Sequence, residues 1–470
     1  MRILDAIRRV ASCFPLDRVL PAMFVLSLGV LCFIGGAYLA EFETPWYQTW
    51  LEPSFRGLRA MTEQQQMLEE KRSIDWDLAR DDKTGVTNHR TDRAYDGLTM
   101  YVSFGETPGA RLISMDGEVV HKWNLPFRKA WPDAPHITNP PPEERIHWHT
   151  ARLLPNGDLI ANYVTAADTP YGYGLVKMDK ASQVIWRYSD CAHHDFDIDE
   201  EGQVYALRHW IRPDKLEGAP HLSTPVLQDF VVVLSPEGEE IQRIAIDEAF
   251  AKSKFRNYLE SIVVDRRGDH THSNGIAVIS KDFADKHDFC EPGDLLLSIR
   301  NPGWLAILNL EREEIVWASC GIWKGQHDPD PLENGNILLF DNNGNQGLGG
   351  KSRILEWNPA NGAVEWEYCG TEEEPFESVS RGCQQLLPNG NILITESNKG
   401  RILEVTRDQE VVWEFNNPHR YEKDSKYVAV VCSAQRYAAS KLKFLNSSGL
   451  GRTKASDSTA SADNRTKELK

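Results

Sequence analysis

Residues 327–337 have the sequence HDPDPLENGNI, in which His327 stands eight residues before Gly335. The same spacing recurs in HTARLLPNGDL (149–159) and HDFDIDEEGQV (194–204), while GCQQLLPNGNI (382–392) carries a glycine in the histidine position. An Asn-Gly or Glu-Gly pair between two apolar runs is typical of the turn of a β-hairpin. The pattern therefore predicts a recurring hairpin whose first strand often begins with an imidazole.

A second type of hairpin alternates with the first. It shows a period-two alternation of apolar residues around a turn and usually a closing tryptophan, in six copies at 110–123, 174–188, 230–244, 304–319, 353–368 and 401–415. Two hairpins make a four-stranded blade, and six blades closed in a ring leave no long open edge. The predicted fold class is therefore all-β, a six-bladed β-propeller. We expect the tryptophans to pack between blades and the ring to close where 382–415 meets 98–123, with 427–438 as a candidate closing strand.

The N-terminal region carries a run of 22 residues without charge, VLPAMFVLSLGVLCFIGGAYLA (19–40). About 20 apolar residues are enough for a helix to cross a bilayer. Arginines precede the run and glutamates follow it, so the positive-inside rule places the N-terminus in the cytoplasm and the propeller in the periplasm or another extracytoplasmic space. A cleaved signal peptide ending near Ala40 is the alternative, and it also exports the domain.

The propeller is thus predicted to follow a single transmembrane helix and a short helical juxtamembrane segment. The predicted domains are a cytoplasmic N-terminus (1–18), the transmembrane helix (19–40), the juxtamembrane segment (41–92), the propeller (93–440) and a disordered tail (441–470). The helical stretch is placed at 57–77, which is rich in Gln, Glu, Leu and Met. The cysteines beyond the N-terminal region permit one or two disulfides, and the absence of a CxxC motif disfavours a structural zinc site.

The composition excludes one class of partner. The chain carries a formal net charge of −17 at pH 7 and has a pI near 5.3. Such a surface repels nucleic acid, so no nucleic-acid partner is expected. An anionic substrate would then require a locally positive pocket.

Residues that carry chemistry are predicted to gather at one mouth of the ring. The innermost strands of a propeller line its channel, so the leading ends of these strands converge. The histidines at these ends are His149, His194, His272 and His327. Arg300 returns to the same mouth at the end of a second strand, and Asn274 faces the same way as His272. A guanidinium beside several imidazoles and an amide donor is a site for a tetrahedral oxyanion.

Neighbouring residues bear on a metal alternative. Three further histidines are expected to be structural, each bonded to a backbone carbonyl: His147, His193 and His270. The alternative is that some of them line a second layer of the site. HxH pairs with an adjacent Asp resemble metal ligands, but strand alternation is expected to turn Asp195 and Asp328 to the opposite face. We therefore predict no metal and no cofactor.

Residues 98–415 resemble the bacterial arylsulfate sulfotransferases in five segments, HWHTARLLPNGDLIANY, HHDF, HTHSN, LLLSIRNPGWLAILN and GQHDPDPLENGNILLFDN. The resemblance implies a propeller that moves a sulfuryl group from an aryl sulfate donor to a phenolic acceptor without a nucleotide donor. It also implies a covalent sulfohistidine intermediate and ping-pong kinetics.

The resemblance further implies roles for individual residues. His327 is implied to be the nucleophile, and His272, Asn274 and Arg300 are implied to bind the sulfuryl oxygens. His194 completes the implied catalytic set. His149 receives no role from the resemblance and is predicted to bind substrate.

Two other functions remain open at this point. A non-catalytic propeller can use a positive site to bind a ligand or a protein partner, because propellers serve both roles. A metal-dependent hydrolase or lyase on the same scaffold is the other alternative. Assay of an aryl sulfate with a phenolic acceptor, with and without a chelator, separates these two functions and the sulfotransferase from one another. The sequence is also compatible with a homodimer.

Overall fold

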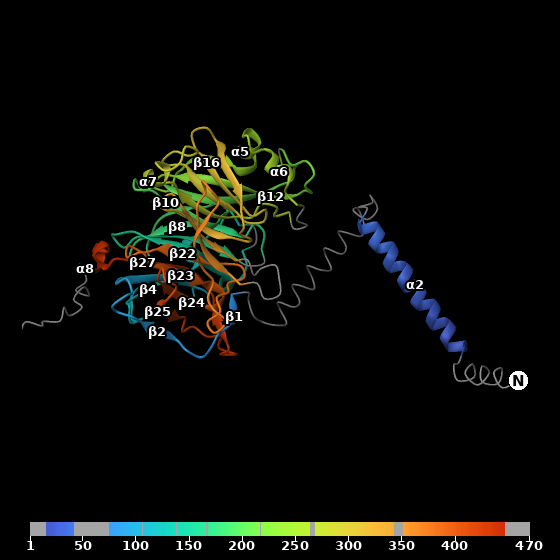
Figure 1. Cartoon of the computed structure of the whole chain (residues 1–470), viewed down its shortest axis with the longest axis horizontal. Coiled ribbons are helices and arrows are strands. Elements are labelled where there is room, and N and C mark those ends of the chain that lie inside the picture. Colours follow the sequence, from blue (N-terminus) through green and yellow to red (C-terminus); the bar gives the residue numbers. More distant parts are fainter. Residues whose placement is uncertain are drawn as a thin grey trace, which may run out of the picture. The chain divides into compact units, whose positions relative to one another are not determined.

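The computed structural model describes residues 16–41, 75–105, 107–137, 140–165, 168–216, 218–263, 268–342 and 351–446 (Figure 1). The chain divides into two compact units, Met1–Arg72 and Ser73–Lys470, which are described separately. The first unit contains helix α2 (Leu16–Glu41), which covers the predicted apolar run. No helix within these described ranges has the length and apolarity that a membrane span requires. Segment 19–40 is thus helical as predicted, but its crossing of a membrane is not shown.

The second unit is a six-bladed β-propeller, as the repeats predict. Each blade is an antiparallel sheet whose strands follow one another from the inner to the outer edge. Blade 1 comprises β27 (Val431–Tyr437), β3 (Leu98–Ser103), β4 (Gly109–Ile113) and β5 (Val119–Asn124). Blade 2 comprises β6 (Ile146–Leu153), β7 (Leu159–Thr165), β8 (Gly172–Met178) and β9 (Val184–Tyr188). Blade 3 comprises β10 (Ala192–Ile198), β11 (Val204–Arg212), β12 (Val226–Leu234) and β13 (Glu240–Ala245).

The remaining blades follow the same order. Blade 4 comprises β14 (Ser273–Val278), β15 (Leu295–Ile299), β16 (Trp304–Asn309) and β17 (Glu314–Cys320). Blade 5 comprises β18 (His327–Pro331), β19 (Ile337–Asp341), β20 (Arg353–Trp357) and β21 (Val364–Tyr368). Blade 6 comprises β22 (Cys383–Leu386), β23 (Ile392–Glu396), β24 (Arg401–Val405), β25 (Val411–Asn416) and an added outer strand, β2 (Gly85–His89).

Short helices lie between the strands. They are α4 (Phe127–Ala130), α5 (Ile246–Lys252), α6 (Asn257–Glu260), α7 (Lys281–Ala284) and α8 (Lys443–Asn446), with 3₁₀ turns at Glu143–Arg145, Ser397–Lys399 and Ala439–Lys441. Strand β1 (Trp76–Leu78) pairs with β26 (Tyr427–Ala429) as a separate two-stranded sheet.

The ring closes by joining the two ends of the domain. β27, from the C-terminal region, pairs with β3 as the inner strand of blade 1, which confirms the closing strand predicted at 427–438. β2, from the N-terminal region, pairs with β25 on the outside of blade 6. Figure 1 shows the blue strand β2 lying beside the orange-red strand β25 of the C-terminal region. Because β1 and β2 belong to this unit, it begins before the boundary predicted at residue 93.

Two further predictions, the helix at 57–77 and the disordered tail at 441–470, concern residues that lie partly outside the described ranges. Most of the predicted helix at 57–77 lies outside them, and its last two residues, Trp76 and Asp77, belong to strand β1 instead. Helix α8 occupies the start of the predicted disordered tail, while 447–470 lie outside the described residues. The seven described cysteines are all unpaired, in contrast to the one or two disulfides that the composition permits.

The closing tryptophans join neighbouring blades, as predicted. Their indole N–H groups donate to backbone carbonyls of the next blade: Trp123 to Gly157, Trp186 to Pro236, Trp366 to Arg407 and Trp413 to Met115. The last of these bonds crosses the closure from blade 6 to blade 1. Beside it, Arg436 forms an ion pair with Glu404 in which both side chains are fully buried. The four tryptophan bonds thus link four pairs of neighbouring blades.

Candidate functional site

The inner strands of five blades are irregular, and in four of them the irregularity lies beside a predicted site residue. Their antiparallel register shifts between Trp148 and Ala151, Ala192 and Phe196, Ser273 and Gly275, His327 and Asp330, and Val431 and Ser433. Within or beside these shifts, His194, His272 and Asp328 have positive φ angles of 47°, 49° and 50°. Such angles are unfavourable for residues other than glycine and are concentrated at functional sites. The sequence thus departs from regular strands where the imidazoles lie.

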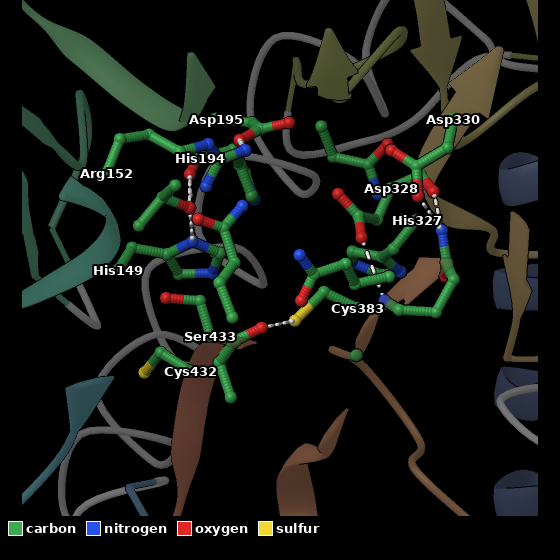
Figure 2. A pocket seen from close by; sticks show the side chains of 17 residues that line it. His149, Arg152, His194, Asp195, His327, Asp328, Asp330, Cys383, Cys432 and Ser433 are labelled. Carbon is green, nitrogen blue, oxygen red and sulfur yellow. Dashed lines mark hydrogen bonds and ion pairs between the residues drawn. The ribbon is translucent and has the colours of Figure 1, made fainter. Parts of the chain in front are cut away.

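The bulges overturn the predicted orientation of two carboxylates. Strict alternation would turn Asp195 and Asp328 away from the histidines that precede them. Instead both carboxylates line the same channel cavity as His194 and His327 (Figure 2). The prediction was wrong because a β-bulge adds a residue to one strand and re-aims the side chains beside it.

Two cavities share His149 and His194 in their walls. The larger has a volume of about 450 Å³ and is also lined by His272 and Arg300. The smaller has a volume of about 90 Å³ and is also lined by His327 and Asn274. Figure 2 shows the smaller cavity with His149 on one side of an open space and His327 on the other. The structure therefore brings all six predicted site residues to one pair of cavities.

The hydrogen bonds of His327 fix its tautomer. Its Nδ1 lies 2.6 Å from Oδ1 of Asn342. The Nδ2 of Asn342 donates to the carbonyls of Ser378 (2.7 Å) and Arg381 (2.9 Å), so the amide cannot be reversed without losing both bonds. An amide oxygen only accepts, and Nδ1 of His327 must therefore carry the proton. The lone pair of neutral His327 is consequently on Nε2.

Backbone and carboxylate acceptors hold two other histidines in the same way. Nδ1 of His149 lies 2.9 Å from the carbonyl oxygen of His194, so it donates and leaves the lone pair on Nε2. Nδ1 of His272 is bonded to the carboxylate of Asp269. The ring centroids of His149 and His272 lie 5.4 and 4.9 Å from that of His194. Three imidazoles thus form a compact cluster.

Burial favours the neutral form of three imidazoles, those of His149, His194 and His327. Desolvation, and then the charge of Arg381, lowers the pKa of His149 to about 3. Desolvation, followed by repulsion from Arg300, holds the pKa of His327 well below its usual range. The pKa of His194 is also well below its usual range, first through desolvation and then through the neighbouring His272. Neutral imidazoles are available as nucleophiles and bases near pH 7.

The wall of the smaller cavity formed by Asp195, Asp328 and Asp330 is acidic. Arg152 lies 3.2 Å from Asp195 and is the cation there. Burial raises the pKa of Asp195 to about 6 and that of Asp328 to about 7, and it raises the pKa of Asp330 well above its usual range. This wall is therefore partly protonated near neutral pH, and the guanidinium groups of Arg300 and Arg381 lie on the larger cavity instead.

Asn274 is committed to the backbone beside His327. Its Nδ2 donates to the carbonyl of Gln326 (2.8 Å), and its Oδ1 accepts from the hydroxyl of Ser298 (2.8 Å). The side chain of Gln326 donates to the Ile299 and Trp304 carbonyls and to the same Ser298 hydroxyl (3.2 Å). Asn274 therefore positions the strand that carries His327, in addition to facing the smaller cavity.

Several site residues were not predicted from the sequence. They are Asn342, Asp269, Tyr171, Arg152 and Arg381. The hydroxyl of Tyr171 is buried, has no hydrogen-bond partner among the described residues, and belongs to a ring 5.3 Å from that of His194. Arg381 carried a signal, because it directly precedes Gly382 in the histidine slot of blade 6. A Cβ at Gly382 would lie 2.4 Å from the ring of Phe340, so a histidine side chain does not fit at this position. The guanidinium of the adjacent Arg381 lines the larger cavity instead.

One trio of side chains is close enough to be considered as a metal site. Ligand atoms of His193, His209 and Asp229, all buried, lie within 4.8 Å of one another. The two rings stack at 4.1 Å and 22°, so an ion in the plane of one ring would meet the face of the other. Nε2 of His209 accepts the N–H of Gly172 (3.3 Å), which places its proton on Nδ1. The stacking therefore disfavours coordination of one ion by both imidazoles, although the facing atoms of the three residues have no hydrogen-bond partner among the described residues.

The other two histidines expected to be structural differ from each other. His270 lies 3.4 Å from the carbonyl of Ser223, as predicted. His147 packs against the ring of Phe104 and lines the larger cavity.

Comparison with known proteins adds a family. A family model described as arylsulfotransferase (ASST) matches residues 150–418, more than half of the chain. No curated protein matches the chain.

Among solved structures, a protein of unknown function from Bacteroides caccae is similar at 11% identity and a TM-score of 0.46, over 72% of this chain and 98% of that one. The β-propeller domain of Cps50 (Swd1) from Myceliophteria thermophila is similar at 12% identity and a TM-score of 0.40, over 76% and 99% of the two chains. Virginiamycin B lyase from Staphylococcus aureus is similar at 9% identity and a TM-score of 0.36, over 73% and 88%.

Proposed function

Since the chain belongs to the arylsulfotransferase family, we propose that it is a sulfotransferase that moves a sulfuryl group from an aryl sulfate to a phenol through a covalent intermediate on His327. The observation that carries the proposal is the fixed tautomer of His327, whose Nδ1–H is held by Asn342. A neutral imidazole with its Nε2 lone pair available is a competent nucleophile.

The first half-reaction forms the intermediate. Nε2 of His327 attacks sulfur, an N–S bond forms, and the S–O bond to the aryl group breaks. The sulfated ring then carries a positive charge, with its remaining proton on Nδ1. Oδ1 of Asn342 accepts that proton's hydrogen bond and so stabilises the charged ring.

The second half-reaction regenerates the enzyme. The oxygen of a phenolic acceptor gives its proton to a base in the cavity and attacks sulfur, the N–S bond breaks, and His327 returns to its neutral form. The sulfuryl oxygens need donors in both steps, and Arg300 and His272 line the cavity beside them. Fixed donors that match charge in the transition state are worth more than equally strong binding of the ground state.

A direct test compares His327→Asn with a matched histidine variant. Asparagine retains an N–H donor near the Nδ1 position but lacks the nucleophilic nitrogen. We expect His327→Asn to abolish transfer from p-nitrophenyl sulfate to phenol, while His270→Asn, in a neighbouring blade and lining neither of the two cavities, keeps it. Undiminished transfer by His327→Asn would reject the proposal.

The same assay separates the alternatives. Transfer that persists with a chelator supports the sulfotransferase, whereas hydrolysis that requires an added metal would favour a hydrolase. A propeller that only binds a ligand would show neither reaction. Because the two half-reactions share one site, parallel lines in double-reciprocal plots are expected.

We also propose that residues 19–40 anchor the chain in a membrane with the propeller on the extracytoplasmic side. The support is the uncharged run with arginines before it and glutamates after it. Full-length protein should stay with membranes in alkaline carbonate, while a variant lacking residues 1–40 should be released. Release of the full-length protein would contradict the anchor. The same two variants, examined by light scattering, test whether the chain forms a homodimer.

A further inference from the structure

A chain of polar groups lies behind His194 in blade 3. Nδ1 of His194 lies 2.8 Å from Nδ1 of His193, and Nε2 of His193 lies 3.6 Å from Oδ1 of Asp229, an ion-pair distance. The side chains of His193 and Asp229 are 0% and 1% exposed. His194 lines both cavities, whereas the other two residues line neither. The chain therefore connects the site with the protein interior.

Donors hold Asp229 in its ionised form. Its Oδ2 accepts the N–H of Ser273 (2.8 Å) and the hydroxyl of Thr271 (2.7 Å). Burial raises the pKa of Asp229, but His193 and then these two donors outweigh burial, so the net pKa is lowered. Its Oδ1 has no hydrogen bond within the described residues and faces His193. A buried carboxylate with one oxygen unsatisfied favours a proton-bearing group beside it, and Nε2 of His193 faces that oxygen at 3.6 Å.

Only one proton can lie between the Nδ1 atoms of His193 and His194. At 2.8 Å, one Nδ1 must donate and the other must accept. If His193 is protonated at both nitrogens, it donates to His194, whose own proton is then on Nε2. If His193 keeps only the proton that faces Asp229, His194 donates from Nδ1 and has its lone pair on Nε2. The two states differ by one proton at Nε2 of His194.

The other titratable groups around His193 and His194 do not compete for the proton that the two residues share. His209 stacks on His193, and its Nε2 is occupied by the N–H of Gly172. His272 lies beside His194 but is bonded to Asp269. Tyr171 meets His193 and His194 edge to face. Protons that leave His194 on its Nδ1 side therefore pass to His193 and its counter-ion Asp229.

We propose that Asp229 and His193 are positioning residues that store a proton for His194, which acts as the general acid and base of sulfuryl transfer. The inference rests on the proposed function. As the donor S–O bond breaks, Nε2–H of His194 protonates the departing phenolate oxygen, and the Nδ1 proton of His193 moves to His194. As the acceptor oxygen attacks sulfur, Nε2 of His194 takes its proton, and the Nδ1 proton returns to His193. One proton is given and one is taken in each cycle.

The test measures how the rate depends on the leaving group. The kcat/KM for the donor contains only the steps up to release of the first phenol, so it isolates the first half-reaction. It is measured with p-nitrophenyl, phenyl and p-methoxyphenyl sulfates, whose phenols become progressively weaker acids. A proton delivered to the leaving oxygen makes the rate nearly independent of phenol acidity, and its loss makes weakly acidic phenols leave slowly.

We expect Asp229→Asn to lower kcat/KM little for p-nitrophenyl sulfate and by about 100-fold for phenyl sulfate, within the usual range of acid catalysis. His193→Asn should give the same steepening, because asparagine accepts from His194 but holds no second proton. The His193→Asn variant therefore tests the inference even if Asp229→Asn does not fold. The matched control is Asp247→Asn, which removes a buried carboxyl bonded to Gln228 away from both cavities and should leave the slope unchanged.

The outcomes separate this inference from the proposed function. Steeper dependence in Asp229→Asn or His193→Asn, with the control parallel to wild type, supports the relay. Slopes parallel to wild type in the folded variants would overturn it, even if all rates fall, because a packing defect slows every donor equally. Absence of transfer by the wild-type protein would reject the proposed function itself.

Discussion

Oδ1 of Asn342 accepts a hydrogen bond from Nδ1 of His327 at 2.6 Å, and the two bonds from its Nδ2 to backbone carbonyls prevent the amide from turning over. This relationship decides which nitrogen of His327 can react. It comes from a residue that directly follows strand β19, 15 positions along the chain from the histidine.

Replacing Asn342 by leucine should impair the chemical step. The side chain is similar in shape but no longer accepts from Nδ1, so His327 loses its fixed tautomer and the support for its charged, sulfated form. We expect kcat to fall by about 100-fold, less than the ~10⁴-fold lost when a catalytic histidine is held in the wrong tautomer. Steady-state kinetics with saturating acceptor measure it, and an unchanged kcat in a folded variant would contradict the assigned tautomer.

Arg300→Lys should weaken transfer although the charge is retained. A planar guanidinium offers parallel donors to two oxygens of one group, whereas an ammonium acts as a point charge. Loss of one such donor in a preorganised site costs about 10²-fold in rate. The control is Arg187→Lys on the exposed outer strand β9, which should behave as wild type. Equal activity of the two variants would show that the Arg300 guanidinium does not bind the sulfuryl oxygens.

The kcat/KM for the sulfate donor should show no decrease around pH 6.5, the pH at which an ordinary histidine becomes protonated. The neutral form of His327 reacts, and burial followed by Arg300 lowers its pKa well below the usual value. A lowered pKa moves protonation to lower pH, so kcat/KM for the donor should stay level from pH 8 to about pH 5, below the ordinary histidine pKa of about 6.5. Aryl sulfates remain ionised throughout this range. An acid limb centred near pH 6.5 would show that the reacting histidine is solvated.

Glu404→Gln should destabilise the ring closure. The variant leaves Arg436 buried without its counter-ion between blades 6 and 1, and breaking a buried pair in this way costs about 3–5 kcal/mol. Urea unfolding of the domain, followed by tryptophan fluorescence, measures the change. The exposed pair Lys281–Asp285 provides the comparison, and Asp285→Asn should not shift the midpoint. Equal midpoints for both variants would show that closure does not depend on the ion pair.

Much of the fold follows from local sequence. Hairpin turns, alternating strands and closing tryptophans are each specified within about 15 residues, and together they predict six blades and the place of closure. The separate start of the domain at β1 and β2 was not predicted, because these short strands are defined by their partners near the C-terminus.

The site was predicted only in part. The shared spacing identified the histidines, but strict alternation misplaced Asp195 and Asp328, since the bulges depend on neighbouring blades. The Oδ2 of Asp328, for example, accepts the N–H of Gln384 from blade 6. Asn342 and Asp229 act through contacts with residues elsewhere in the chain, and no local pattern distinguishes them from other Asn and Asp residues. Asp269 lies only three residues before its partner His272, but nothing in the spacing alone shows that the two side chains meet.

The most direct test of the central claim is mass spectrometry of the protein after brief exposure to an aryl sulfate without acceptor. Because the N–S bond of a sulfated histidine is labile in acid, the sample is quenched and digested at alkaline pH. The account predicts one added sulfuryl group on the peptide that contains His327, lost again when a phenol is supplied. Transfer that proceeds at full rate while this peptide remains unmodified would contradict the covalent mechanism.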